Sequence, residues 1–205
     1  MMNLNRWNRW RYTLYAPLYD WITQSFAVSR QRSITLLELS AGEKLLIVGA
    51  GTGEDLPFIP AGVNVLATDL TPAMVARMQQ KAQHLPCQVE ARVMDGQALN
   101  LPDATFDAVI LHLILAVIPD PYACIREVNR VLKPGGRVVI YDKFLPADAK
   151  LTWIRRALNL LTSIAFSDIN RKREEIVASV ALRLLHEEPA TYQRLGYSIA
   201  LYEKS

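Results

Sequence analysis

The chain has few cysteines, little excess charge and no long hydrophobic run, and each shortage excludes a class of protein. Its 205 residues include two cysteines, Cys87 and Cys124, which lack the CxxC or Cys/His spacing of metal sites and redox motifs. Two such thiols are typical of core residues in a reducing compartment. We therefore expect no bound metal and a cytoplasmic location.

Signal-peptide and membrane-spanning patterns are missing too. Residues 1–7 lack the continuous apolar core and cleavage site of a signal peptide. The longest apolar run, 108–118, is interrupted by His112 and is too short to cross a bilayer. This run instead predicts a strand buried on both faces of a sheet.

The net charge is only +3, which does not suggest the basic face of a nucleic-acid-binding protein. We therefore expect no nucleic-acid partner. Arginines do alternate with aromatic residues at 6–12, and Arg155 and Arg156 lie inside an apolar segment. Both patterns suit contact with an anionic membrane surface. The hypothesis is peripheral contact through residues 1–21 and 150–166, at the inner face of the membrane.

Apolar strands alternate with helical segments along most of the chain. The expected strands are 44–48, 63–69, 87–94, 106–113 and 137–142, and the expected helices are 11–39, 71–83 and 120–132. Gly42 ends the first helical segment, Thr71 caps the second, and the turn at 133–136 stops the third. This alternation predicts an α/β fold with an open, mostly parallel sheet and helices on both faces.

The carboxyl-terminal part departs from this rhythm. Residues 150–166 and 170–180 are predicted to be helical, and 182–188 and 197–203 to be strands. The interval between these two strands is too short for a helical crossover, so we expect an antiparallel hairpin that completes a seven-stranded sheet. The simplest account is a single domain over 1–205, with a helical cover at 1–40 and a helical insertion over the substrate opening at 150–180.

The strand at 44–48 runs directly into Gly49, Gly51 and Gly53. Glycines after a strand leave backbone N–H groups bare and let a ligand approach closely. They predict a nucleotide-like cofactor beyond the carboxyl ends of the strands. Phosphate-binding loops, dinucleotide folds and methyltransferases all use such glycines, so this motif alone does not choose among them.

Polar residues end the next three strands. Asp69 follows Gly53 by sixteen residues and can accept hydrogen bonds from both hydroxyls of a ribose. Asp95 is placed to accept a hydrogen bond from an exocyclic amine, and His112 ends the fourth strand. Each aspartate also suits a turn or a helix cap.

Five motifs in order resemble those of class I S-adenosylmethionine-dependent methyltransferases. They lie at 48–53, 68–74, 94–99, 101–109 and 130–136. The resemblance implies a Rossmann-like methyltransferase fold, with S-adenosyl-L-methionine as cofactor and S-adenosyl-L-homocysteine as product. It also implies the closing antiparallel hairpin.

The resemblance assigns the cofactor-binding residues motif by motif. They are Gly49, Ala50 and Gly51 beside the methionine part, Asp69 and Leu70 beside the ribose, and Met94, Asp95 and Gly96 beside the adenine. The strand end near His112 would face the methionine part and the sulfonium. Many members have an acidic residue where this chain has Ile47, so the usual anchor of the cofactor's amino group is in question.

The segment Tyr-Ala-Pro-Leu-Tyr-Asp at 15–20 resembles one in small bacterial phosphatidylethanolamine N-methyltransferases and in quinone C-methyltransferases. In such proteins it covers the cofactor, so Tyr15 and Tyr19 are candidate contacts of the cofactor or the acceptor. The alternative is that both tyrosines pack a helix on the sheet. Residues 117–121 resemble the phospholipid enzymes more than the quinone enzymes.

Methyl transfer from a sulfonium needs alignment and desolvation more than acid or base chemistry. A protonated amine must still lose its proton, and His112 or Tyr19 is the candidate group. The alternative for His112 is a hydrogen-bonded core histidine.

The leading hypothesis is an S-adenosylmethionine-dependent methyltransferase of a lipid or hydrophobic small molecule, with phosphatidylethanolamine-type N-methylation first. An amphipathic helix expected at 151–164 supports this choice. The alternatives are methylation of a soluble metabolite or a quinone, and a non-catalytic protein that binds S-adenosylmethionine. A dinucleotide-dependent oxidoreductase fits less well, because its third glycine comes one residue later.

Overall fold

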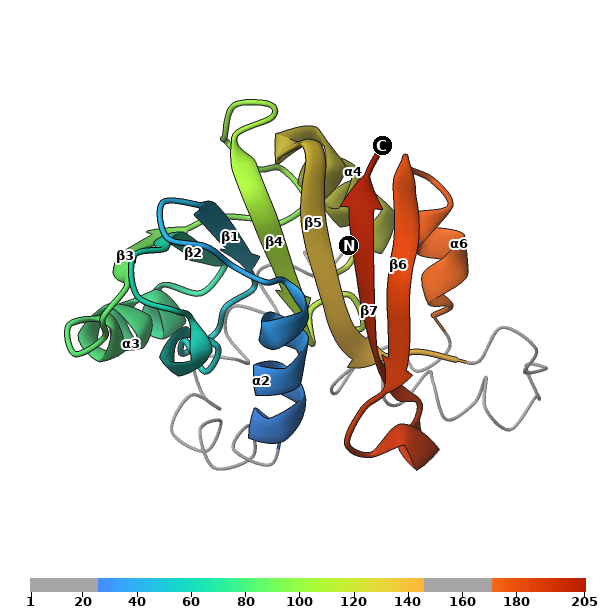
Figure 1. Cartoon of the computed structure of the whole chain (residues 1–205), viewed down its shortest axis with the longest axis horizontal. Coiled ribbons are helices and arrows are strands. Elements are labelled where there is room, and N and C mark those ends of the chain that lie inside the picture. Colours follow the sequence, from blue (N-terminus) through green and yellow to red (C-terminus); the bar gives the residue numbers. More distant parts are fainter. Residues whose placement is uncertain (1–25, 146–170) are drawn as a thin grey trace, which may run out of the picture.

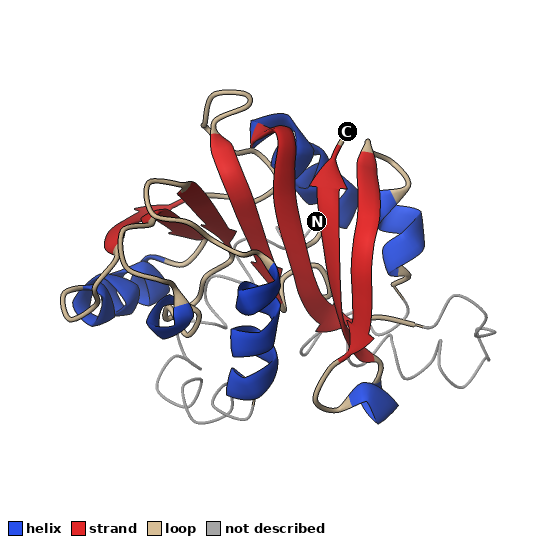
Figure 2. Ribbon diagram, in the orientation of Figure 1, coloured by secondary structure: helices blue, strands red, loops and turns tan. Residues whose placement is uncertain are grey.

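The computed structural model describes residues 26–145 and 171–205, and these form a seven-stranded sheet with helices on both faces (Figures 1 and 2). The strands are β1 (Lys44–Val48), β2 (Asn64–Asp69), β3 (Gln88–Val93), β4 (Phe106–His112), β5 (Leu132–Lys143), β6 (Leu182–Pro189) and β7 (Tyr197–Lys204). The helices are α2 (Ala27–Leu36), α3 (Pro72–Ala82), α4 (Pro121–Val131) and α6 (Arg173–Val177), with 3-10 turns η1 (Leu56–Phe58) and η2 (Gln193–Leu195). The predicted α/β class is confirmed.

The strand order is β3-β2-β1-β4-β5-β7-β6. The first five strands pair in parallel, whereas β7 is antiparallel to both β5 and β6. The predicted carboxyl-terminal hairpin is therefore confirmed, with β7 inserted beside β5 (Figure 1). Along the chain, β2 and β3 extend the sheet on one side of β1, and β4 and β5 extend it on the other side. The strand order therefore reverses between β1 and β4, and ligands bind at such switch points in open α/β sheets.

Both faces of the sheet are covered by apolar layers. Leu45 and Ile47 of β1 point into the core shared with α2 and α3, while Leu46 and Val48 point into the core shared with α4 and α6. All four side chains are at most 1% exposed. A strand buried on both faces needs an unbroken apolar run, which is what the sequence of β1 shows.

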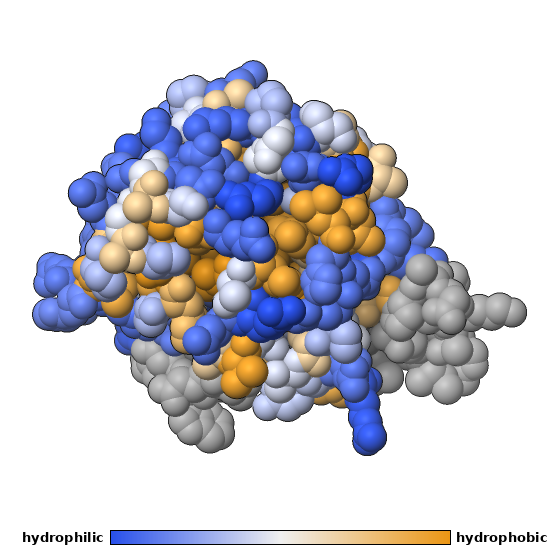
Figure 3. Space-filling model, in the orientation of Figure 1, coloured by the Kyte–Doolittle hydropathy of each residue, from blue (hydrophilic) through white to orange (hydrophobic). Residues whose placement is uncertain are grey.

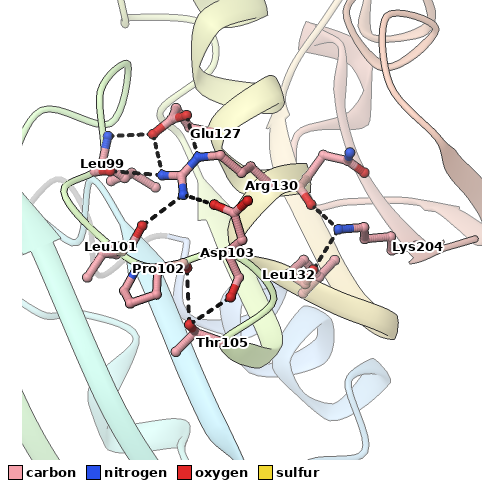
Figure 4. Close-up of polar contacts among 10 residues, drawn as sticks. Leu99, Leu101, Pro102, Asp103, Thr105, Glu127, Arg130, Leu132 and Lys204 are labelled. Carbon is pink, nitrogen blue, oxygen red and sulfur yellow. Dashed lines mark hydrogen bonds and ion pairs between the residues drawn. The ribbon is translucent and has the colours of Figure 1, made fainter.

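Two crossovers of the parallel part contain no α-helix. The chain passes from β1 to β2 through η1 alone, and residues 94–105, between β3 and β4, form neither helix nor strand. Arg130 of α4 holds this second loop by donating to the carbonyls of Leu99 and Leu101 at 2.9 and 2.8 Å (Figure 4). Glu127 accepts from the Leu99 N–H at 2.8 Å. Two side chains of α4 thus replace the missing helix as the support of this loop.

The end of the first helical segment differs from the prediction. The described part, α2, ends at Leu36 and not near Leu39 or Gly42. The Arg137 side chain donates to the carbonyls of Leu37 and Glu38, which caps the helix with a residue that is distant in sequence. Residues 11–25 of the predicted segment lie outside the described residues.

The turn predicted at 133–136 is wrong. β5 begins at Leu132, directly after α4, and runs through both glycines. Leu132 pairs with Phe106 of β4, and the register shifts before the next pair, Ala108 with Arg137. Four residues of β5, 133–136, therefore lie opposite the single residue Asp107 of β4, and Gly135, with a φ of 72°, accommodates this bulge.

The helix predicted at 170–180 is also too long. α6 covers only Arg173–Val177 and ends in a tight turn, in which the Val180 N–H donates to the Val177 carbonyl at 3.1 Å. Residue 170 and most of the predicted insertion lie outside the described residues. The single domain, the cover at 1–40 and the insertion at 150–180 stay predictions.

Replacing Arg130 should destabilise the protein through the loop that it holds. Arg130→Met removes donors from two backbone carbonyls, and we expect the free energy of unfolding to fall by about 1–2 kcal/mol. Arg126→Met is the matched control, because Arg126 is exposed on the same helix. Chemical denaturation measures both, and equal effects would contradict this role of Arg130.

Candidate active site

A cavity opens where the sheet order reverses, at the carboxyl ends of β1, β2 and β4. It contains about 690 Å³ of empty space, part of it open to solvent. Four loops supply its lining: the glycine loop after β1, the end of β2 with the start of α3, the loop after β3 and the loop after β4.

Glycine is required in the cavity wall for steric reasons. Gly49 has a φ of 70°, and a Cβ at this position would lie 2.6 Å from Cδ1 of Ile114. A Cβ on Gly96 would lie 2.7 Å from Cγ1 of Val48. Ala50 does not line the cavity, because its side chain is buried and its N–H donates to the Thr68 carbonyl at 2.8 Å.

Asp69 connects two of the lining loops. One carboxylate oxygen accepts from the N–H of Gly51 at 3.0 Å, and the other accepts from the N–H of Thr71 at 2.8 Å. Burial raises the pKa of Asp69, and these two hydrogen bonds oppose that rise. Thr71 is the N-cap residue of α3, as predicted, but its side chain makes no capping hydrogen bond. The carboxylate of Asp69 instead holds the backbone just before α3.

Asp95 makes the turn that the sequence allowed, and it lies at the cavity. Its Oδ1 accepts from the backbone N–H and the side-chain amide of Gln97, both at 2.9 Å, which is an Asx turn. Asp95 and Gln97 also line the cavity. The Gln97 side chain accepts from the N–H of Asp120 at 2.8 Å, so this turn is tied to the start of α4.

The loop after β4 forms the apolar wall of the cavity. Its lining residues are Leu113, Ile114, Val117, Ile118 and Pro119. Leu113 has a φ of 57°, a conformation that non-glycine residues rarely adopt and that carries strain. This conformation turns the chain away from the sheet and over the glycine loop.

His112 lies beside this loop but does not line the cavity. It is 3% exposed. Its Nδ1 is 2.7 Å from Oδ1 of Asp55, and its Nε2 is 2.8 Å from the hydroxyl of Ser33. Arg30 of α2 donates to the same Asp55 oxygen at 2.7 Å. Both ring nitrogens therefore have partners inside the protein, and the geometry favours the core histidine over a base.

The charges of this cluster follow from burial and pairing. Burial lowers the pKa of His112 and so does Arg30, although Asp55 opposes them. Arg30 and His112 together overcome the burial of Asp55 and hold its pKa well below the usual range. Nδ1 of His112 donates to Asp55, because a carboxylate only accepts, whereas the Ser33 hydroxyl that contacts Nε2 also donates to the carbonyl of Arg30 at 2.8 Å.

The structure brings together seven of the predicted cofactor-binding residues. The seven that line the cavity are Gly49, Gly51, Asp69, Leu70, Met94, Asp95 and Gly96. Ala50 and His112 lie nearby but outside the lining. Tyr15 and Tyr19 lie outside the described residues, as do 1–21 and 150–166, so their predicted roles are untested.

The sequence prediction missed other lining residues, among them Thr71, Met74 and Gln97. Thr71 and Gln97 each follow a predicted aspartate by two residues, the spacing of an Asx turn, and this signal could have found them. No short motif predicts the apolar residues after β4. No sequence motif predicts a role for Asp55, although it is the centre of the buried cluster with Arg30 and His112.

Within the described ranges, no group of three or more His, Cys, Asp or Glu side chains could hold a metal ion. Cys87 and Cys124 are free and buried. Burial raises the pKa of the Cys124 thiol to about 12, so this group is not a nucleophile near neutral pH.

Comparisons with known proteins agree with this geometry. A family model described as a methyltransferase domain matches residues 46–140. A phosphatidylethanolamine N-methyltransferase from Cereibacter sphaeroides is 29% identical over 174 residues, which are 84% of this chain and 86% of that relative. A demethylmenaquinone methyltransferase from Paenarthrobacter aurescens is 31% identical over 62% of this chain and 51% of its own length. These likenesses place a methyltransferase domain at residues 46–140 and support a class I S-adenosylmethionine-dependent methyltransferase.

A solved structure agrees with the fold of this methyltransferase. Geranyl diphosphate methyltransferase in complex with S-adenosylmethionine superposes with a TM-score of 0.73 over 87% of this chain and 85% of its own. At 16% identity, the likeness concerns the fold and not the acceptor.

Adding a methyl group at Gly49 should abolish cofactor binding. In Gly49→Ala the new Cβ collides with Ile114 and the backbone is strained, so we expect the Kd for S-adenosylhomocysteine to rise at least 100-fold in isothermal titration. Gly135→Ala is the control, because Gly135 has a similar φ of 72° and a Cβ added there would have nothing within 4 Å. Similar Kd values for the two variants would exclude Ile114 and Gly49 from the cofactor site.

His112 should make stability depend on pH. The pKa of His112 is lower in the folded state than the value of about 6.5 expected in the unfolded chain. Below that pH the unfolded chain therefore binds a proton more readily than the native state does. Stability should therefore fall as the pH drops through this window. His112→Asn should remove this component, whereas the exposed His84→Asn should keep it. Denaturation between pH 5 and 8 measures the slopes, and an unchanged slope in His112→Asn would contradict the assignment.

Proposed function

We propose that this methyltransferase methylates the amine of a phosphatidylethanolamine-type lipid. The observation that carries the proposal is the extent of the likeness to the Cereibacter sphaeroides enzyme, which covers 84% of this chain and 86% of that relative. The matched 174 residues reach well beyond the 46–140 segment of the family model. The likeness to the demethylmenaquinone enzyme covers only 51% of that relative.

We place S-adenosylmethionine in the cavity beyond β1, β2 and β4. The Asp69 carboxylate accepts from two backbone N–H groups and from the Thr71 hydroxyl, so one of its four lone pairs remains to accept from a ribose hydroxyl. Asp95 lines the same cavity and would accept from the exocyclic amine of the adenine. The bare backbone at Gly49 and Gly51 would lie along the methionine part.

The lining suits desolvation better than proton transfer. When bound, the cofactor supplies an electrophilic methyl group on a sulfonium. Asp69 and Asp95 are the only ionisable side chains among the described residues that line the cavity, and the proposal assigns both to cofactor contacts. The apolar side chains after β4 would exclude water from the reacting atoms. We therefore propose that the acceptor amine arrives unprotonated or releases its proton to water.

The membrane part of the proposal rests on sequence. Residues 1–21 and 150–166 combine arginines with aromatic or apolar residues and would contact anionic lipid. Tyr15 and Tyr19 would cover the cofactor from the first of these segments. Over the described ranges, no helix has the length and apolarity that a membrane crossing needs.

Transfer of labelled methyl groups to defined acceptors tests the proposal. With vesicles that contain phosphatidylethanolamine and an anionic lipid, we expect at least tenfold more label in the lipid phase than with vesicles of phosphatidylcholine and the same anionic lipid. Gly49→Ala should give background label in both. Demethylated quinone in detergent and an aqueous metabolite extract provide the rival acceptors.

Label that enters the quinone or the aqueous extract, and not phosphatidylethanolamine, would overturn the lipid assignment. The membrane contacts are tested separately by vesicle flotation. Replacement of Arg155 and Arg156 by glutamine should reduce flotation with anionic vesicles, whereas Arg183→Gln, in β6, should not. Equal flotation of the two variants would contradict the proposed contact between residues 150–166 and anionic lipid.

A further inference from the structure

The loop after β4 determines the width of the cofactor cavity. The Ile114 side chain lies against Gly49, and the Ile118 side chain lies against Gly96, where an added Cβ would be 3.3 Å from Ile118 Cδ1. These glycines belong to the opposite wall. A small shift of the loop would therefore widen the cavity or close it.

Few hydrogen bonds within the loop hold it in place. The N–H groups of Val117 and Ile118 donate to the carbonyl of Ile114 at 3.0 and 2.9 Å, which closes a single turn. Leu113, at the start of the loop, has strained backbone. Groups outside the loop must hold it against this strain.

The first of these groups is the carboxylate of Asp142, near the end of β5. Asp142 is 2% exposed. Its Oδ2 accepts from the N–H of Ala116 at 3.0 Å, and its Oδ1 accepts from the N–H of Lys143 at 2.7 Å. The N–H of Leu115 also donates to this carboxylate. Asp142 thus holds the beginning of the loop by its backbone donors.

The second group is the guanidinium of Arg171, which precedes α6. Arg171 donates from Nη1 to the carbonyls of Leu115 and Ile118, the latter at 2.6 Å, and from Nη2 to the carbonyl of Pro119 at 3.4 Å. Its own carbonyl accepts from the N–H of Leu145 at 2.9 Å, which keeps it beside the end of β5. Arg171 thus holds the remainder of the loop by its backbone acceptors.

We propose that Asp142 and Arg171 are positioning residues of the methyltransferase, which set the cofactor affinity by fixing the loop at 113–119. Neither side chain lines the cavity, so they act through the loop and not on the cofactor. A carboxylate only accepts and a guanidinium only donates, with several N–H groups in a rigid fork. Asp142 and Arg171 together therefore bind both the N–H groups and the carbonyl groups of one loop.

Binding of S-adenosylhomocysteine to three variants tests the pair. We expect the Kd to rise at least tenfold in Arg171→Met and Asp142→Asn, and less in Arg171→Lys, which keeps one charged donor. Arg183→Met is the control, since Arg183 is exposed and pairs with Glu203 outside the cavity. In steady-state assays the KM for S-adenosylmethionine should rise more than kcat falls, because the reacting atoms are not contacted.

The pH profile separates positioning from a general loss of structure. Burial raises the pKa of Asp142 to about 6, so its carboxylate is protonated as the pH falls through 6 and becomes a poorer acceptor. The wild-type affinity for S-adenosylhomocysteine should fall in that window. In Asp142→Asn the affinity should lose the part of this pH dependence that comes from Asp142. The part that comes from Asp69 should remain in both proteins. Near Asp142 the other charged or titratable groups are Arg171, Lys143, Tyr141 and Tyr197.

The outcomes distinguish this inference from the placement of the cofactor, on which it rests. If Gly49→Ala loses binding while Asp142→Asn and Arg171→Lys bind as the wild type does, the cavity is correct and the positioning role is wrong. If Gly49→Ala also binds normally, the placement itself is wrong. Should Arg171→Met not fold, the isosteric Asp142→Asn carries the test.

Discussion

The cavity depends on one constraint, which is that the backbone of its loops has no regular structure. Buried N–H and C=O groups need partners, and the crossovers after β1 and β3 contain no α-helix that would pair them. Side chains from other elements supply the missing partners. Asp69 holds the glycine loop, Arg130 and Glu127 hold the loop after β3, and Asp142 with Arg171 holds the loop after β4.

This solution places charged groups inside the protein, and their surroundings decide what each can do. Burial raises the pKa of any carboxylate, and it prevails at Asp142, whose pKa rises to about 6, and at Asp69. At Asp55 the outcome is the reverse, because Arg30 and His112 are both in direct contact with it. The three aspartates therefore differ in the direction of their pKa shifts, although each lies near the same edge of the sheet. Asp55 ties α2 to the chain after the glycine loop, whereas the other two hold cavity walls. Figure 3 shows one face of the outer surface, where hydrophilic side chains surround the exposed apolar ones.

Much of the fold was predictable because it depends on short-range patterns. The unbroken apolar run at 45–48 and the glycines after it indicate a buried parallel strand followed by a ligand loop. The strand is present, and Gly49 and Gly51 line the cavity. The short interval before Tyr197 indicates the antiparallel hairpin. The errors lie where distant groups decide a boundary. Arg137 ends α2 before Gly42 is reached. The pairs that Leu132 and Arg137 form with β4 enclose residues 133–136 in β5 as a bulge.

The sequence by itself determined the order of strands and helices and the aspartates at the strand ends, because a strand with its following loop is a local unit. The class of cofactor came from the resemblance that five motifs carry together. Only the tertiary structure decided how His112, Asp55, Asp142 and Arg171 are used. Arg171 lies more than fifty residues from the loop that it holds, and no local pattern records such a contact. His112 stands at the predicted strand end, yet α2 and the chain after the glycine loop supply partners for both ring nitrogens. A side chain's role is settled by which hydrogen-bonding groups the fold brings to it, and for these residues the groups come from distant parts of the chain.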